Sequence, residues 1–256
     1  FACKEYELVI NKDIEEILHL DFEDGTSFEA TGAEIYEIVF NSGQPWIISA
    51  NGTIFTHEKK GIIPGLLERW YAERKELQAK ARDARAEGGD AFAYWDKRQL
   101  VKKINLNSLY GALLNPGSRF FDSRLGQSTT LTGRSIAKHM AAEINKIMAG
   151  VYDHQGDAIV YGDTDSTYFS AYPMLKEQIK KGEINWDRDN IIAYYDAVCE
   201  EVSKTFPGFM SRTFHTTLEL GSIIAAGREM VGSAGLFITK KRYAMLVFDN
   251  EGKRED

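Results

Sequence analysis

The sequence predicts an α+β fold in which helices back an antiparallel sheet and a two-helix hairpin projects from it. Two observations support this prediction. Residues 64–114 contain two long helical patterns separated by glycines, and residues 158–169 contain two short strand-forming runs around a turn. Long helices and paired strands that do not alternate regularly are typical of α+β proteins. At 256 residues the chain can form one large domain or two small ones.

Composition excludes several classes of protein. No apolar run approaches the roughly 18 residues that span a bilayer, and no basic segment precedes an apolar one as in a secretory signal. We therefore expect no membrane partner. Cys3 and Cys199 are the only cysteines, so neither a disulfide framework nor a zinc site is expected. This composition is typical of a reducing compartment, and the expected location is the cytoplasm.

Residues 1–56 should form mixed short elements, because aromatic and β-branched clusters at 35–40 and 46–48 are separated by turn sequences. Residues 1–56 carry 2 Lys/Arg against 11 Asp/Glu, whereas residues 58–107 carry 12 against 8. This asymmetry favours one face turned toward a polyanion, although solvated helix surfaces can have the same composition.

The projecting hairpin is predicted from helical spacing of apolar residues. Pro64 should open the first helix, since proline is tolerated in a first turn, and the pattern continues to about residue 86. Gly88-Gly89 permits a reversal, and a second helix should run over residues 91–114. Each helix would be about 30 Å long, and a short turn makes the pair antiparallel.

The remaining elements are predicted in the same way. A helix should follow Gly133 and end at Gly150, and another should run from about residue 191 to Pro207. Extended segments at 216–220 and 236–248 should complete the antiparallel sheet.

Two carboxylates lie within Tyr161-Gly162-Asp163-Thr164-Asp165-Ser166. Side chains two apart on an extended backbone project to the same face, so Asp163 and Asp165 could converge on one cation. Carboxylate oxygens suit Mg²⁺ or Mn²⁺, and such ions stabilise the attacking and leaving oxygens in phosphoryl transfer. Gly, Asp, Thr and Ser also form ordinary hairpin turns, so this hexapeptide is not decisive by itself.

The second helix carries a polar stripe. Gln99, Lys103 and Asn107 stack at i, i+4 and i+8, and Tyr110 lies one turn beyond. Lys103 could place a point charge on a triphosphate, and Arg74 on the facing helix could add a guanidinium fork. A solvated helix face would show the same residue types, and Tyr110 alone would suggest core packing.

Three motifs in this order resemble those of the family B DNA polymerases. Residues 103–111 are similar to motif B, Lys-x-x-x-Asn-Ser-x-Tyr-Gly, and residues 161–166 to motif C, Tyr-Gly-Asp-Thr-Asp-Ser. Residues 240–243 are similar to the Lys-Lys-x-Tyr motif, and residues 117–124 are most similar to replicative polymerases of tailed bacteriophages. The resemblance covers roughly residues 52–248.

The resemblance implies a polymerase palm with a fingers hairpin. Residues 1–57 would be a palm-associated segment, 58–115 the fingers, and 116–256 the palm with its metal-binding hairpin and primer contacts. The implied reaction is template-directed attack of a primer 3′-hydroxyl on the α-phosphate of a deoxynucleoside triphosphate, with two Mg²⁺ ions or Mn²⁺. Fingers closure would align the phosphate-binding residues.

The resemblance also implies roles for single residues. Asp165 would bridge both metals, with Asp163 nearby and Glu219 at a position where the family keeps an acidic residue near the metals. A second group would bind the incoming nucleotide: Arg74, Lys103 and Asn107 on the triphosphate, and Tyr110 against the nascent base pair. Lys103 would in addition protonate the leaving pyrophosphate. The expected DNA contacts are Lys241, Tyr243 and Arg119.

Departures from the family pattern suggest that the chain is one part of a polymerase. Motif A, Asp-x-x-Ser-Leu-Tyr-Pro-Ser, has no match before Arg74, and Gln78 stands where many relatives place a lysine. No proofreading exonuclease motif is found, and the chain stops where a thumb should begin. We therefore expect an inactive chain whose partners are primer–template DNA, dNTPs, and a polypeptide with motif A and the exonuclease and thumb parts. A sliding clamp is a further candidate partner.

Two other functions are compatible with these motifs. A non-catalytic nucleic-acid-binding or assembly module that kept a polymerase fold is the main alternative, and an RNA-making polymerase is a second. The five histidines have no ligand spacing, and the sequence contains no Gly-x-x-x-x-Gly-Lys-Ser/Thr loop.

Overall fold

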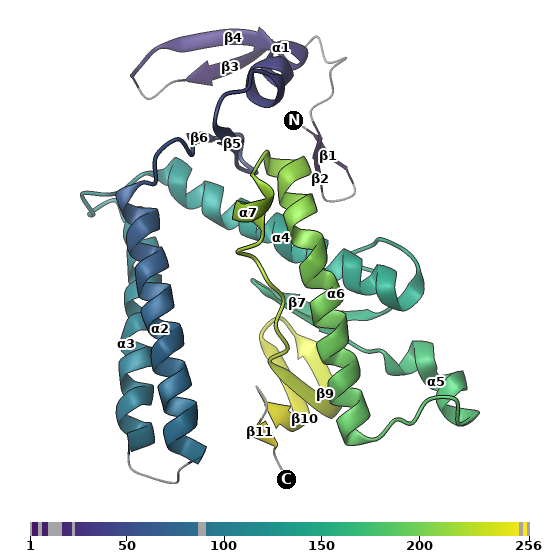
Figure 1. Cartoon of the computed structure of the whole chain (residues 1–256). Coiled ribbons are helices and arrows are strands. Elements are labelled where there is room, and N and C mark those ends of the chain that lie inside the picture. Colours follow the sequence, from purple (N-terminus) through teal and green to yellow (C-terminus); the bar gives the residue numbers. More distant parts are fainter. Residues whose placement is uncertain are drawn as a thin grey trace.

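The computed structural model describes residues 2–4, 7–9, 17–21, 24–86, 91–250 and 253–254, and combines long helices with small antiparallel sheets (Figure 1). The predicted short elements near the N-terminus are confirmed. They are β1 (Ala2–Lys4), β2 (Glu7–Val9), β3 (Ile17–Asp21), β4 (Ser27–Thr31), α1 (Gly32–Tyr36), the π-helical η1 (Glu37–Asn41), β5 (Trp46–Ile48) and β6 (Ile54–Thr56).

The predicted pair of long helices is also present. Helices α2 (Ile62–Ala86) and α3 (Ala91–Leu113) pack side by side and project from the rest of the chain (Figure 1). The glycines expected to reverse the chain, Gly88-Gly89, lie outside the described residues. Among the described residues, the buried hydrophobic side chains of this pair are those of Ala81, Ala84 and Leu113. Two of these three side chains are single methyl groups.

Helix α4 (Ser123–Ala149) begins about ten residues earlier than the sequence suggested. The Asp122 side chain accepts a hydrogen bond from the Arg124 backbone N–H at 2.9 Å, which caps the first turn, and Gly133 lies inside the helix. The predicted end is confirmed, because Gly150 adopts a left-handed conformation with φ 76°. A short helix, α5 (Tyr172–Lys180), follows farther along the chain and was not expected.

The expectation that Pro207 ends its helix is wrong, because α6 (Arg188–Phe214) continues through it. A proline inside a helix costs about 3 kcal/mol. The part of the helix after Pro207 buries Phe209 and Phe214, each at most 2% exposed, and each large apolar side chain contributes roughly 1.5–3 kcal/mol. Burial on one face of the helix therefore outweighs the helix-breaking residue.

The predicted single sheet is divided into separate pieces. Four two-stranded sheets are present within the described residues: β1–β2, β3–β4, β5–β6, and β7 (Ile159–Asp163) with β8 (Ser166–Phe169). A three-stranded sheet contains β9 (Met230–Thr239), β10 (Arg242–Asn250) and β11 (Lys253–Arg254). All pairings are antiparallel.

The segment 216–220 is not extended, contrary to the prediction. Its residues lead into the short helix α7 (Leu218–Gly221), because the Thr217 hydroxyl accepts from the Leu220 N–H at 3.2 Å and caps the turn. Gly221 lies so close to α6 that an added Cβ would come within 2.9 Å of Pro207. Close packing and a side-chain cap thus replace the expected strand.

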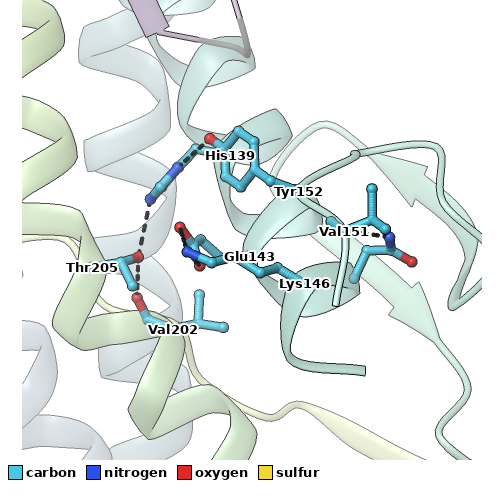
Figure 2. A network of polar contacts seen from close by, with 8 residues as sticks. His139, Glu143, Lys146, Val151, Tyr152, Val202 and Thr205 are labelled. Atoms are coloured by element: carbon cyan, nitrogen blue, oxygen red, sulfur yellow. Dashed lines mark hydrogen bonds and ion pairs between the residues drawn. The ribbon is translucent and has the colours of Figure 1, made fainter. Parts of the chain in front are cut away.

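The main core lies between α4 and α6, where Ile144, Val198, Val202 and Phe206 are buried. Beside it, the ring of His139 stacks on Phe209 with centroids 4.0 Å apart. Figure 2 shows His139 bonded to Tyr152 through Nδ1 at 2.7 Å and to Thr205 through Nε2 at 3.0 Å.

Burial, aided by the positive charges of Arg212 and Lys146, lowers the pKa of His139 to about 4. The imidazole is therefore neutral at pH 7. No described helix is both long and apolar enough to cross a bilayer.

Candidate functional site

The predicted acidic turn is the tip of the β7–β8 hairpin. Asp163 pairs with Ser166, so Thr164 and Asp165 form a two-residue turn. Such turns need a positive φ, and Thr164 adopts φ 56°, an uncommon conformation for a β-branched residue. The Thr164 hydroxyl donates to Asp163 Oδ1 at 3.1 Å, and the Ser166 hydroxyl donates to the Asp163 carbonyl at 3.0 Å. The turn is therefore built largely by the side chains beside the two carboxylates.

The two carboxylates have different surroundings. Asp163 has a side chain 28% exposed, and its Oδ2 lies 3.7 Å from Lys241 Nζ. Asp165 is exposed and lines a cavity of about 1120 Å³. The two side chains are not placed on one face by strand alternation, because β7 ends at Asp163 and Thr164 reverses the chain before Asp165. Both carboxylates still belong to one tight turn.

The turn between β9 and β10 lies against this hairpin. Lys241 adopts φ 62°, and its backbone N–H donates to the Tyr161 hydroxyl at 2.8 Å. The hydroxyls of Tyr168 and Tyr243 are 2.7 Å apart. The structure therefore brings two predicted DNA-contacting residues, Lys241 and Tyr243, next to the acidic turn.

Aromatic packing joins the two hairpins. The rings of Tyr161, Tyr168, Phe237 and Tyr243 have centroids between 5.1 and 6.0 Å apart. Burial and the hydrogen bond that it shares with Tyr243 raise the pKa of Tyr168 above its usual value. The Tyr168 phenol therefore stays neutral at pH 7. The aromatic side chains connect two sheets that share no ladder hydrogen bonds.

Helix α2 supplies the opposite wall of the cavity. Arg74 lines it, and its Nε donates to Gln99 Oε1 at 3.3 Å, while Gln99 Nε2 donates to Asp96 Oδ1 at 3.0 Å. Arg82 and Arg85 line the same cavity nearer the tip of the helical hairpin. A basic wall thus faces the wall that contains Asp165.

The other predicted nucleotide-binding residues do not line this cavity. Lys103 and Asn107 are exposed, and neither makes a side-chain hydrogen bond or ion pair with any residue that the structure describes. Tyr110 is half-buried, and its hydroxyl lies 2.9 Å from Thr130 Oγ1 on α4. The neighbouring Lys102 is the one that pairs across the hairpin, with Glu73 on α2.

Two further predicted residues lie apart from the turn. Glu219 is exposed on α7, a helix rather than the strand assumed from the sequence. Arg119 is exposed in the loop between α3 and α4. Among the described residues, no three His, Cys, Asp or Glu side chains are grouped closely enough to hold a metal ion. The carboxylates of Asp163 and Asp165 are therefore the oxygen donors available at the turn.

Sequence reasoning missed part of the cavity wall. Arg74, Gln78 and Arg82 recur every four residues on α2, and this spacing could have identified one basic face. Arg228 also lines the cavity and pairs with Asp196 at 2.6 Å and with the buried Asp249. These three residues are far apart in the sequence, so no local signal indicated that they would meet.

Comparisons with known proteins give one family. The family model described as DNA polymerase family B matches residues 12–182. A DNA-directed DNA polymerase of Escherichia phage RB69 is 30% identical over 167 residues, which are 61% of this chain and 18% of the phage protein. A DNA polymerase of Red sea bream iridovirus is 26% identical over 220 residues, or 85% of this chain and 20% of the relative.

A solved structure gives a partial match. The family B DNA polymerase from the archaeon Pyrobaculum calidifontis has 21% sequence identity and a TM-score of 0.41, over 56% of this chain and 18% of that one. The chain thus spans about a fifth of the length of each of these relatives.

Proposed function

The chain belongs to DNA polymerase family B, and from this premise we propose that it supplies the fingers and palm of a template-directed DNA polymerase. The reaction is attack of a primer 3′-hydroxyl on the α-phosphate of a bound dNTP. One observation supports this function above the others: the exposed Asp165 and the basic face containing Arg74 line one cavity of about 1120 Å³ from opposite walls. The basic wall suits the triphosphate, and the acidic wall suits the metal ions that accompany it.

The proposed domains follow the packing. Residues 58–115 would be the fingers, since α2 and α3 form a separate projecting pair (Figure 1). Residues 116–256 would be the palm, with both hairpins backed by α4 and α6. Residues 1–57 would be a palm-associated segment.

Asp163 and Asp165 fit a hard divalent cation such as Mg²⁺ or Mn²⁺, because Asp165 offers carboxylate oxygens on the two-residue turn and Asp163 offers them at the end of the strand directly before it. When bound, such ions stabilise the attacking and leaving oxygens of phosphoryl transfer. Lys241 near Asp163 would compensate part of the negative charge of the turn. Glu219, on α7, stays outside this proposed pair, because no three acidic side chains of the described residues are grouped closely enough to hold a metal ion.

Arg74 would bind the phosphates of the incoming nucleotide. Its bond to Gln99 fixes one edge of the guanidinium and leaves other N–H groups free to donate. Lys103 and Asn107 would join only after the α2–α3 pair moves toward the hairpin, since neither lines the cavity. Lys103 would then be placed to protonate pyrophosphate, and Tyr110 to contact the nascent base pair.

The proposed DNA contacts follow the surface of the palm. Lys241 and Tyr243 would hold the primer strand beside the acidic turn, and Arg119 would contact DNA from the loop before α4. The further partners are a polypeptide with motif A, exonuclease and thumb parts, and a candidate sliding clamp.

A reconstitution experiment tests this function. The sequence contains no Asp-x-x-Ser-Leu-Tyr-Pro-Ser segment, so the 256-residue chain alone should not extend a labelled primer. Addition of a polypeptide that carries motif A should give extension with Mg²⁺, and Asp165→Ala should abolish it. Robust extension by the chain alone, or reconstituted extension that survives Asp165→Ala, would contradict the proposal.

A further inference from the structure

We propose that Asn145 is a positioning residue for the Asp163/Asp165 turn, although it lies on α4 and touches neither carboxylate. This inference rests on the proposed function for its catalytic meaning. Asn145 is 2% exposed, so its amide is removed from water and needs partners within the protein. Both of its partners are backbone groups of the segment that leads from α4 into β7.

The amide spans the ends of this segment. Asn145 Nδ2 donates to the Val151 carbonyl at 2.8 Å, and Oδ1 accepts from the Ala158 N–H at 3.1 Å. A backbone carbonyl only accepts and a backbone N–H only donates, so the two partners define which way the amide points. Only a side chain with one donor and one acceptor at this distance satisfies both.

The segment is built to receive this side chain. Gly156 lies against the amide, and an added Cβ would come within 2.1 Å of Asn145 Nδ2 and 2.2 Å of Cγ. The Gly156 carbonyl accepts from the Ile159 N–H at 2.9 Å, which closes a turn directly before β7. The absence of a side chain at Gly156 is therefore what allows the backbone to approach Asn145.

Ala158 connects the amide to both strands of the hairpin. Its N–H is bound by Asn145, and its carbonyl accepts from the Ser170 N–H at 3.0 Å, just beyond the end of β8. Ala158 is fully buried. Asn145 thus fixes the base of the hairpin at the point where both strands leave the core.

Register explains why this base matters for the turn. The β7–β8 ladder has an irregularity between Ile159 and Tyr161, so its own hydrogen bonds are interrupted near the base. A one-residue shift in the pairing of β7 with β8 would turn every side chain of β7, including that of Asp163, to the other face of the hairpin. An anchor at Ala158 prevents this slip.

Hydrogen exchange on the full 256-residue chain tests the proposal directly. Asn145→Ala should speed exchange at Ala158 and in β7–β8 about tenfold more than in α4 and α6. Ser128→Ala is the matched control, because Ser128 is also a buried polar residue of α4 but bonds toward residues 49–51. An equal loss of protection in hairpin and helices, or the same local loss in Ser128→Ala, would overturn the proposal.

Two more variants sharpen the result. Gly156→Ala should reproduce the hairpin exchange of Asn145→Ala, and the double variant should be no worse than either single one, because the new methyl enters the space left by the amide. Additive effects would contradict a direct contact. Asn145→Asp retains the acceptor for the Ala158 N–H, so it should keep more exchange protection at Ala158 than Asn145→Ala does. It replaces Asn145→Ala in the test if that variant does not fold.

Metal binding separates this proposal from the function on which it rests. Titration with MnCl₂ alone, followed by the electron paramagnetic resonance of free Mn²⁺, should show binding that Asp165→Asn removes and Asn145→Ala weakens about tenfold. Unchanged affinity in Asn145→Ala, with loss in Asp165→Asn, would contradict the positioning role in the metal site. Unchanged affinity in Asp165→Asn would instead contradict the proposed metal site, and hydrogen exchange would still decide whether Asn145 fixes the hairpin.

Discussion

The α2–α3 pair and the α4–α6 pair are similar in length but differ in what holds them together. The four helices have 25, 23, 27 and 27 residues. Phe206, Phe209, Val202 and Ile144 are buried between or beside α4 and α6. The α2–α3 pair buries small alanines and Leu113.

Charged contacts replace apolar burial in the α2–α3 pair. Lys102 pairs with Glu73, and Lys80 lies over the ring of Trp95 at 5.1 Å. Such exposed contacts contribute little and can be exchanged for water, whereas a packed core cannot be opened without a large cost. The difference indicates a rigid scaffold for the acidic turn and a helical pair that can move against it.

Truncation of the scaffold should have the largest effect. Phe206→Ala is expected to lower the free energy of unfolding by about 3–5 kcal/mol, because it leaves a cavity between α4 and α6. Urea denaturation followed by circular dichroism measures this change. A loss below about 1 kcal/mol would show that the α4–α6 core does not dominate stability.

Acid should weaken the scaffold through His139. Its pKa is about 4 in the folded chain and 6.5 when unperturbed, so the unfolded chain binds more protons between these values. The free energy of unfolding should therefore fall as the pH is lowered from about 6.5 to about 4, by at most about 3 kcal/mol from this group. Urea denaturation at several pH values measures the slope. The slope should be smaller in His139→Gln, and identical slopes would exclude His139 as the cause.

A small change inside the α2–α3 pair should act locally. Ala81→Gly is expected to cost about 1 kcal/mol, since glycine disfavours a helix interior. Hydrogen exchange should become faster in α2 and α3 and stay unchanged in α4 and α6. If all four helices respond equally, the two pairs unfold together and the proposed contrast is wrong.

Loss of one surface ion pair should have the smallest effect. The hydrogen bond from Lys102 lowers the pKa of Glu73, but the carboxylate is exposed to solvent. Glu73→Gln should therefore leave the urea midpoint unchanged within error, at low and at high salt. A clear shift at low salt that disappears at high salt would show that the helical pair depends on this charge.

Local patterns predicted most elements of this fold and misplaced those decided by burial. Helical spacing identified α2 and α3, and Gly150 marked the end of α4. Proline suggested the end of a helix at Pro207, yet the packing of Phe209 and Phe214 carries α6 beyond it. The segment before Glu219 looked like a strand, but the Thr217 cap makes it helical.

The candidate site was predictable in composition and only partly in arrangement. Lys241 lies beside Asp163, and Tyr243 contacts Tyr168 on the same hairpin as Asp165, while the roles of these residues stay predictions. Lys103 and Asn107 do not line the cavity. The sequence could not show this, because helical spacing places residues on one face of a helix but does not orient that face toward another element. Their roles, and that of Glu219, stay predictions.

The sequence by itself determined the family, the acidic turn and the pair of long helices, because each depends on neighbouring residues or on a regular spacing. The tertiary structure alone decided that Arg74 and Asp165 share a cavity and that Asn145 holds the base of β7. These relations join residues that are distant in the chain or connected through backbone groups. Backbone N–H and C=O groups are the same at every position, so no residue pattern shows which of them a buried amide will bind.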